Sequence, residues 1–161
     1  MKKIFQTGVT SWLALAFWLG LCFTAAWIGS RFSPGEWYAR LSQPALTPPS
    51  WVFGPAWTLL YLMMGTAAWL LWQRHGLAKA AWPLGFFVLQ LGRNTLWSYL
   101  FFGLKNPGLA LVEIIALWLA ILATLIAFWQ HHRPAGVLLL PYLLWVSFAV
   151  YLNLQFWRLN P

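Results

Sequence analysis

Hydrophobic positions along this chain fall into five long runs that are separated by more polar stretches. The runs cover about 9–28, 51–72, 80–103, 108–130 and 135–157. A bilayer core of about 30 Å is crossed by roughly 20 apolar residues in a helix. The pattern therefore predicts an all-α fold, an integral membrane bundle of five transmembrane helices that forms a single domain over residues 1–161. The first run is longer than the core of a secretory signal peptide, so we interpret it as a retained helix.

One connection between these runs, Ser30 to Ser50, is much longer than the others and holds four prolines. A loop of this length in a small helical protein is more often functional than filler. It contains the sequence Ser33-Pro34-Gly35-Glu36, in which a possible N-cap serine precedes proline and glutamate. This order is typical of a helix start. We expect Ser33 to cap a short interfacial helix over Pro34–Leu41, within a long, partly ordered loop.

The composition agrees with a multi-pass membrane protein and excludes several other classes. Hydrophobic residues make up 61% of the chain and charged residues 7%, with 14 tryptophans. So few charges cannot cover a water-facing surface, which argues against a soluble enzyme, a disordered chain or a nucleic-acid binder. The net charge of +8 comes from basic residues in no long run, as expected at the edges of membrane spans. We expect location in a bacterial cell membrane, with membrane lipid as a partner and no nucleic acid.

Two ionisable residues, Arg93 and Glu113, lie inside the expected spans. Charged groups in a bilayer are unfavourable and therefore suggest a role. The tight turn near 104–107 would place the two residues on adjacent helices at depths that differ by roughly 6–8 Å, a gap that the long arginine side chain could bridge. We interpret them as a structural ion pair; binding of an acidic ligand and snorkelling of Arg93 to the headgroups are the alternatives.

The third run has two distinct faces when it is placed on a helix. Polar and aromatic residues, namely Gln90, Asn94, Trp97 and Phe101, share one face, which should point into the bundle. Small residues share another: Ala81, Gly85 and Gly92. Small residues allow helix backbones to approach closely in membranes. This second face is either a homodimer seam or a contact within the chain.

Aromatic stripes recur in the second and fifth runs. One contains Phe53, Trp57, Tyr61 and Met64, and the other Trp145, Ala149, Leu152 and Asn153. About half of the tryptophans lie near span ends, as interfacial anchors do. A smaller set falls on inward faces: Trp57, Trp97 and Trp145, with Trp51 at the junction of the long loop. Indoles beside amides suit a pocket for a flat aromatic ligand, and simple packing is the alternative.

Three segments resemble a known family. They are Trp37-Tyr38 through Pro48-Pro49-Ser50-Trp51-Val52-Phe53-Gly54-Pro55-Ala56-Trp57 to Met64-Gly65, then Gln90 to Gly103, and Pro141-Tyr142 to Leu152-Asn153. The chain resembles the TspO/translocator protein family, also called tryptophan-rich sensory proteins or the peripheral benzodiazepine receptor. The resemblance implies a five-helix protein, usually a homodimer, that binds porphyrins such as protoporphyrin IX. An arginine at position 93 is unusual for the family, and Gln155 stands where its animal members have the tyrosine of a cholesterol motif.

The resemblance also implies a site and leaves three functions open. The expected ligand-binding residues are Pro49, Phe53, Trp57, Tyr61, Asn94, Trp97, Phe101, Trp145, Ala149, Leu152 and Asn153. The favoured function is a membrane receptor or sensor that takes a porphyrin, protoporphyrin IX or heme, as its ligand and requires no cofactor or metal. The first alternative is a light-dependent porphyrin-degrading enzyme with Trp57 and Trp145 as electron donors. The second is a porphyrin or lipid transporter, which the lack of an inverted repeat disfavours.

Overall fold

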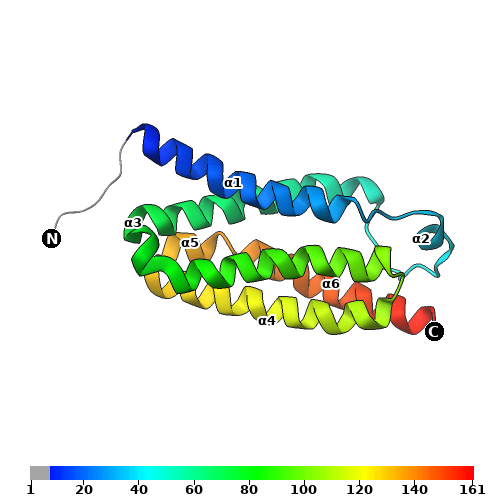
Figure 1. The fold of residues 1–161 in the computed structure, drawn as a ribbon. Coiled ribbons are helices and arrows are strands. Elements are labelled where there is room, and N and C mark those ends of the chain that lie inside the picture. The colour runs from blue at the N-terminus through cyan, green and yellow to red at the C-terminus, as the bar shows by residue number, and fades with distance from the viewer. Residues whose placement is uncertain (1–7) are drawn as a thin grey trace.

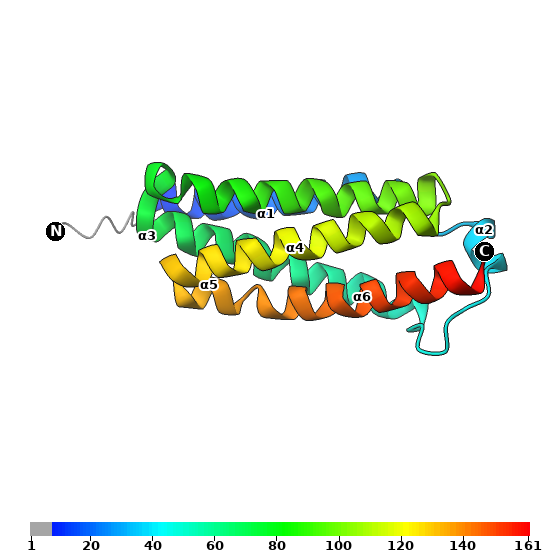
Figure 2. The ribbon, with the colours of Figure 1, turned by 90° about the horizontal axis from the view of Figure 1, so that it is seen from below.

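Every regular element of the structure is helical. The computed structural model describes residues 8–161. In chain order the elements are α1 (Val9–Ser30), α2 (Glu36–Arg40), α3 (Ser50–Ser98), the π-helix η1 (Tyr99–Gly103), α4 (Pro107–His131), α5 (Arg133–Val137) and α6 (Leu140–Leu159). The long helices lie side by side along one direction, with α2 and the C-terminus at the same end (Figures 1 and 2). The predicted all-α bundle is confirmed.

The second and third hydrophobic runs form the two halves of α3, which reverses direction at Gly76. This residue has φ 69° and ψ 171°. A positive φ is readily adopted only by glycine, because any side chain would clash there. A single residue therefore makes the reversal, and the two halves of α3 lie antiparallel in the bundle (Figure 1).

The fifth hydrophobic run is interrupted near its start. The helix breaks between α5 and α6 at residues 138–139, just before Pro141. Proline has no N–H to donate to the preceding turn, which explains the break. Three stretches are long and apolar enough to cross a membrane by length and composition: α1, α4 and Arg133–Leu159, with mean hydropathies of 1.7, 2.6 and 2.0.

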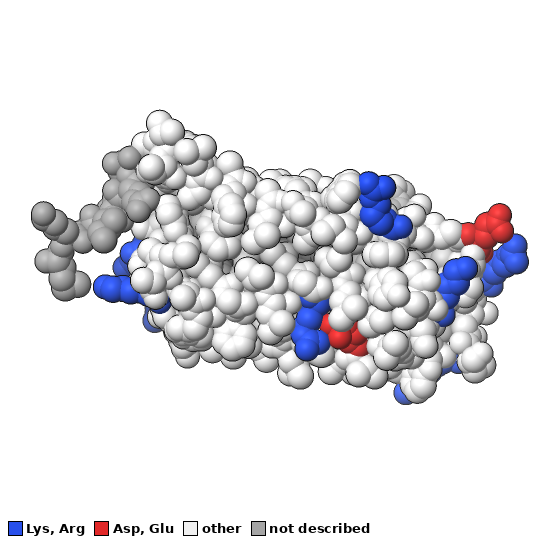
Figure 3. All heavy atoms as spheres, in the orientation of Figure 1, with Lys and Arg blue, Asp and Glu red and all other residues white. Residues whose placement is uncertain are grey.

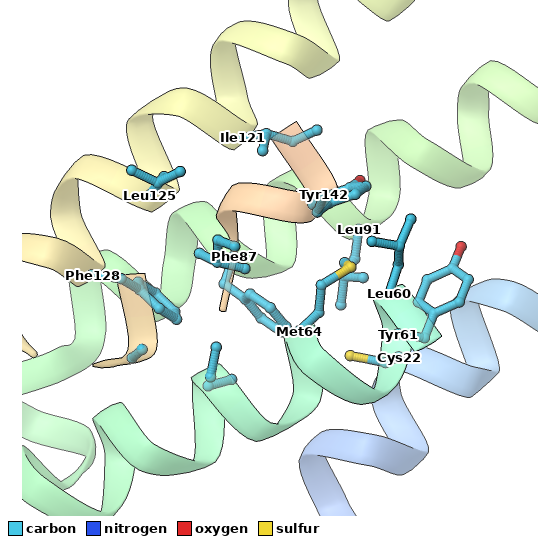
Figure 4. Close-up of a cluster of buried hydrophobic side chains, with 14 of the residues drawn as sticks. Cys22, Leu60, Tyr61, Met64, Phe87, Leu91, Ile121, Leu125, Phe128 and Tyr142 are labelled. Atoms are coloured by element: carbon cyan, nitrogen blue, oxygen red, sulfur yellow. The ribbon is translucent and has the colours of Figure 1, made fainter. Parts of the chain in front are cut away.

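The core lies between the two halves of α3 and the helices beside them. Met64, Phe87 and Tyr142 are completely or almost completely buried there (Figure 4). The rings of Phe87 and Phe128 stack with centroids 5.9 Å apart. Gly65 brings α3 against α1, since a Cβ at this position would lie 3.1 Å from the Cα of Leu19. Close packing of this kind holds membrane helices together where water does not drive association.

The short helix expected in the long loop is present, but its predicted cap is wrong. Helix α2 begins after Gly35, and no side chain caps it. Ser33 lies two residues too early to reach the first turn. Tyr38 packs this helix onto Phe101 and Phe156 at the end of the bundle, with centroid distances of 6.4 and 5.3 Å.

Candidate functional site

A cavity of about 480 Å³ lies within the bundle, toward the end that carries α2. Helix α1, both halves of α3, α4, α6 and the start of the long loop form its wall. Its lining residues are Phe23, Ala26, Gly29, Ser30, Phe32, Ser33, Pro34, Phe53, Gly54, Trp57, Thr58, Tyr61, Asn94, Trp97, Ser98, Phe102, Ile114, Leu117, Trp145, Val146 and Ala149. The volume falls in the range of about 300–1,000 Å³ that is usual for small-molecule sites.

Aromatic rings at several angles form the central part of the wall. Trp57 and Tyr61 lie one turn apart on α3. Their ring centroids are 5.5 Å apart, and the ring planes are tilted by 30° to each other. Trp145 of α6 stands nearly perpendicular to Trp57, at 82° and 6.4 Å, and to Phe53, at 78° and 6.0 Å. Edge-to-face contacts of this kind are favourable and hold the rings in place. The wall thus offers flat apolar surfaces in two orientations.

A chain of hydrogen bonds fixes the polar part of the wall. Tyr61 Oη donates to Asn94 Oδ1 at 2.9 Å, and Asn94 Nδ2 donates to Tyr142 Oη at 3.0 Å. Tyr142 Oη donates in turn to Gln90 Oε1 at 2.9 Å. The hydroxyl hydrogen of Tyr61 is therefore already used in the bond to Asn94, and toward the cavity the Tyr61 oxygen can only accept a hydrogen bond.

Trp97 is held by a second, separate network. Its Nε1 donates to Asn153 Oδ1 at 2.9 Å, and Asn153 Nδ2 donates to the carbonyl of Pro107 at 2.7 Å. Helix α6 and the start of α4 are thereby joined through one amide. By contrast, no hydrogen bond from the indole N–H of Trp57 or Trp145 is found within residues 8–161. Both residues line the cavity.

The structure brings most of the predicted site residues together. Phe53, Trp57, Tyr61, Asn94, Trp97, Trp145 and Ala149 line the cavity. Pro49, Phe101, Leu152 and Asn153 do not: Pro49 caps α3, Phe101 is buried in the cluster under α2, and Leu152 and Asn153 are buried in the packing of α6. The inward placement predicted for Trp51 is wrong, because its side chain is 74% exposed. It lies in the first turn of α3 and points away from the bundle.

Sequence reasoning missed the contribution of α1 and α4 to the wall. Phe23, Ala26, Gly29 and Ser30 of α1 line the cavity, as do Ile114 and Leu117 of α4. Helix α1 is apolar almost all round, so its sequence gives no face that could be assigned to a cavity. In the structure, Gly29 allows α1 to approach the second half of α3, because a Cβ there would lie 3.4 Å from Ser98 Oγ.

Arg93 and Glu113 form the predicted ion pair, and it lies outside the cavity. Arg93 Nη1 is 3.0 and 3.1 Å from the two carboxylate oxygens of Glu113. The pair is visible on the surface of the bundle, part-way along the spans (Figure 3). The side chain of Arg93 is 35% exposed and that of Glu113 12%. The predicted ion pair is therefore confirmed, and its structural role stays a prediction.

Two further basic residues lie at the end of the bundle that carries α2. Arg40 pairs with Glu36 at 3.0 Å on α2. Arg31 stands between Ser30 and Phe32, which both line the cavity, and its guanidinium lies 4.3 Å from the ring of Trp27. Arg31 has no carboxylate partner among residues 8–161. Over the same residues, no group of His, Cys, Asp and Glu side chains is arranged to hold a metal ion.

The small-residue face of α3 is open. Ala81, Gly85 and Gly92 are all exposed. A Cβ at Gly85 or Gly92 would meet nothing within 4 Å in the protomer. A contact within the chain, one of the two interpretations of this face, is therefore not what the structure shows.

Comparisons with known proteins agree with this architecture over most of the chain. A model of the TspO/MBR family matches residues 12–158. The chain is 43% identical to the tryptophan-rich protein TspO of Chlorobaculum tepidum over 156 residues, which is 92% of this chain and 97% of that protein. It is 42% identical to the tryptophan-rich sensory protein of Cereibacter sphaeroides over 149 residues, 92% of each. The translocator protein of Homo sapiens is 43% identical over 138 residues, 83% of this chain and 82% of the human protein.

Proposed function

The chain is a multi-pass membrane protein that belongs to the TspO/MBR family, and we propose that it is a receptor for porphyrins and similar planar aromatic ligands. The observation that carries the proposal is the cavity walled by Trp57, Trp97 and Trp145. The volume of the cavity is in the range of small-molecule sites, and the rings of its wall offer the flat apolar contacts that a conjugated macrocycle needs. A bacterial cell membrane, expected from the sequence, stays a prediction.

The polar groups of the wall match such a ligand. Tyr61 Oη can accept a hydrogen bond, which suits a pyrrole N–H. The free indole N–H groups of Trp57 and Trp145 suit acceptors on the ligand. Three arginines, Arg31, Arg40 and Arg93, are candidate partners for ligand carboxylates. Arg40 and Arg93 are paired with glutamates, which leaves Arg31, whose chain neighbours Ser30 and Phe32 line the cavity. A guanidinium binds a carboxylate through charge-assisted hydrogen bonds.

The test is quenching of tryptophan fluorescence by protoporphyrin IX in detergent. We expect saturable quenching of the parent protein, because three indoles border the site. The double variant Trp57→Phe/Trp145→Phe should bind at least tenfold more weakly. Trp12 and Trp51 are 70% and 74% exposed, so Trp12→Phe/Trp51→Phe removes two indoles without altering the wall. Unchanged affinity in the first variant, or equal loss in both, would sink the assignment.

A second candidate function is light-dependent degradation of the bound porphyrin. The observation that favours it is the position of Trp57 and Trp145, whose ring centroids are 6.4 Å apart on the same cavity wall. Either indole is then close enough to give an electron to a photoexcited ligand, with dioxygen as the oxidant. Illumination separates the two functions. If the absorbance of bound porphyrin decays no faster than that of free porphyrin, the enzymatic function fails and the receptor stands.

A further inference from the structure

Basic side chains gather at the end of the bundle that lies opposite α2. Arg74 and Lys79 flank the reversal of α3 at Gly76, and Arg133 begins α5. All three side chains are exposed. The chain has two acidic residues in all, and both lie elsewhere: Glu36 on α2, and Glu113 against Arg93. Figure 3 shows Lys and Arg at this end without any Asp or Glu beside them. Among residues 8–161, the cations at this end therefore have no counter-ion.

Histidine side chains tie this end together. His75 Nε2 donates to the carbonyl oxygen of His131 at 3.0 Å, which joins the reversal of α3 to the end of α4. His131 Nδ1 donates to the carbonyl oxygen of Ala127 at 2.8 Å. The two rings lie 5.7 Å apart.

His132 shows the effect of this uncompensated charge. Its pKa is lowered from the usual 6.5 by burial first, and then by the nearby positive charges of Arg74 and His75. Arg74 and His75 of α3 are the charged neighbours that act on it, and His131 and Arg133 flank it in the chain. None of these is an anion. An anion bound from outside would therefore be attracted by Arg74 and by the exposed Arg133.

The surrounding aromatic residues indicate where that anion comes from. Trp82 packs edge-on against the ring of His131, with centroids 5.2 Å apart. Trp82 and Trp129 are 52% and 41% exposed at the same end. Exposed indoles at the ends of membrane spans mark the level of the lipid headgroups. The basic side chains lie at or just beyond this level, where lipid phosphates are the abundant anions.

We propose that this basic cluster, formed by Arg74, His75, Lys79, His131, His132 and Arg133, binds the headgroup of an anionic phospholipid from the adjoining leaflet. Arginine side chains reach a phosphate through paired N–H donors, and Lys79 adds a point charge. The site is separate from the cavity, which lies toward the other end of the bundle. It does not depend on the identity of the ligand in that cavity.

The experiment titrates the full-length protein in a neutral detergent with short-chain phosphatidylglycerol, and separately with phosphatidylcholine, and counts bound lipid by native mass spectrometry. We expect phosphatidylglycerol to bind at least tenfold more tightly to the parent. Arg74→Gln/Arg133→Gln should bind phosphatidylglycerol about tenfold more weakly than the parent does. The reason is that each basic residue near a headgroup makes a similar contribution to the affinity, and this variant lacks two of them. Lys105→Asn/Arg158→Gln is the matched control, because it removes the same charge at the α2 end; it should bind as the parent does.

Three outcomes would overturn the proposal. Equal affinity for the two lipids would mean that headgroup charge is not recognised. Equal loss in the two double variants would mean that net charge alone attracts the lipid. Displacement of the lipid by inorganic phosphate at the same concentration would mean that the cluster binds free phosphate and not a lipid. Both altered arginines are exposed, and a thermal unfolding curve like that of the parent would show that the folded bundle was tested.

Discussion

Trp97 and Asn153 are joined by a hydrogen bond of 2.9 Å from the indole Nε1 to the amide Oδ1. One partner lines the cavity, and the other is 1% exposed behind it on α6. The amide cannot rotate freely, because its Nδ2 also donates a hydrogen bond to the carbonyl of Pro107. Asn153 therefore positions a cavity wall without touching the cavity.

Replacement of Asn153 by leucine should weaken both folding and ligand binding. The indole N–H of Trp97 and the carbonyl of Pro107 would each lose a partner, which costs about 1–2 kcal/mol in a membrane protein. Thermal unfolding should report that loss. Affinity for protoporphyrin IX should fall several-fold, because Trp97 is free to turn. If affinity is unchanged while the melting temperature falls, Asn153 supports the fold and does not position the wall.

The sequence predicted the inward faces of the third run well and the cavity itself only in part. Asn94 and Trp97 were placed correctly because polar groups in a membrane helix turn toward the bundle, and helical spacing identifies that face. Asn153 was expected at the ligand, since its spacing cannot distinguish a residue on the wall from one that holds the wall. Phe23 gave no signal, because α1 is apolar on every side. Ser33 matched a capping pattern that the backbone of the loop does not use.

Arg31 should contribute to affinity only when the ligand carries carboxylates. Arg31→Gln removes a guanidinium that lies against the ring of Trp27 and has no carboxylate partner among residues 8–161, next to the cavity-lining Ser30 and Phe32. We expect protoporphyrin IX to bind roughly fivefold to tenfold more weakly, as for loss of one partly exposed charge-assisted contact. Its dimethyl ester should bind the variant and the parent equally. Arg40→Gln is the control, because Arg40 is already paired with Glu36. Equal weakening of both ligands would show that Arg31 affects the shape of the cavity and does not bind carboxylate.

The Arg93–Glu113 pair should behave as a unit when either charge is removed. Arg93→Leu or Glu113→Leu alone leaves one charge without a partner within the span, and each should lower the free energy of unfolding by about 2–3 kcal/mol. The double variant should recover most of that loss, since two apolar side chains suit the lipid-facing surface. A double-mutant cycle on chemical unfolding measures the coupling. Strictly additive losses would contradict direct pairing.

The open face of α3 is where we propose that a second copy of the chain packs. Gly85→Leu/Gly92→Leu fills space that the protomer leaves empty, so it should shift a dimer toward monomer without unfolding the chain. Gly20→Leu is a matched control, because Gly20 also faces open space, on α1. Light scattering in detergent, or cross-linking in vesicles, measures whether the protein is a monomer or a dimer. A parent that is monomeric in both, or a control that dissociates equally, would refute this interface.

His132 should make stability depend on pH in a way that anionic lipid removes. Its pKa is below 6.5 in the folded protein, and the unfolded chain has the usual value. As the pH falls through 6.5 the unfolded chain takes up the proton first, so the folded state loses stability until the lower, folded pKa is passed. In phosphatidylcholine nanodiscs the melting temperature should therefore fall over this range. Phosphatidylglycerol beside Arg74 and His75 raises the pKa again, so the fall should be smaller. His132→Gln should show neither this fall nor its dependence on lipid, and an identical fall in both lipids for the parent would contradict the linkage.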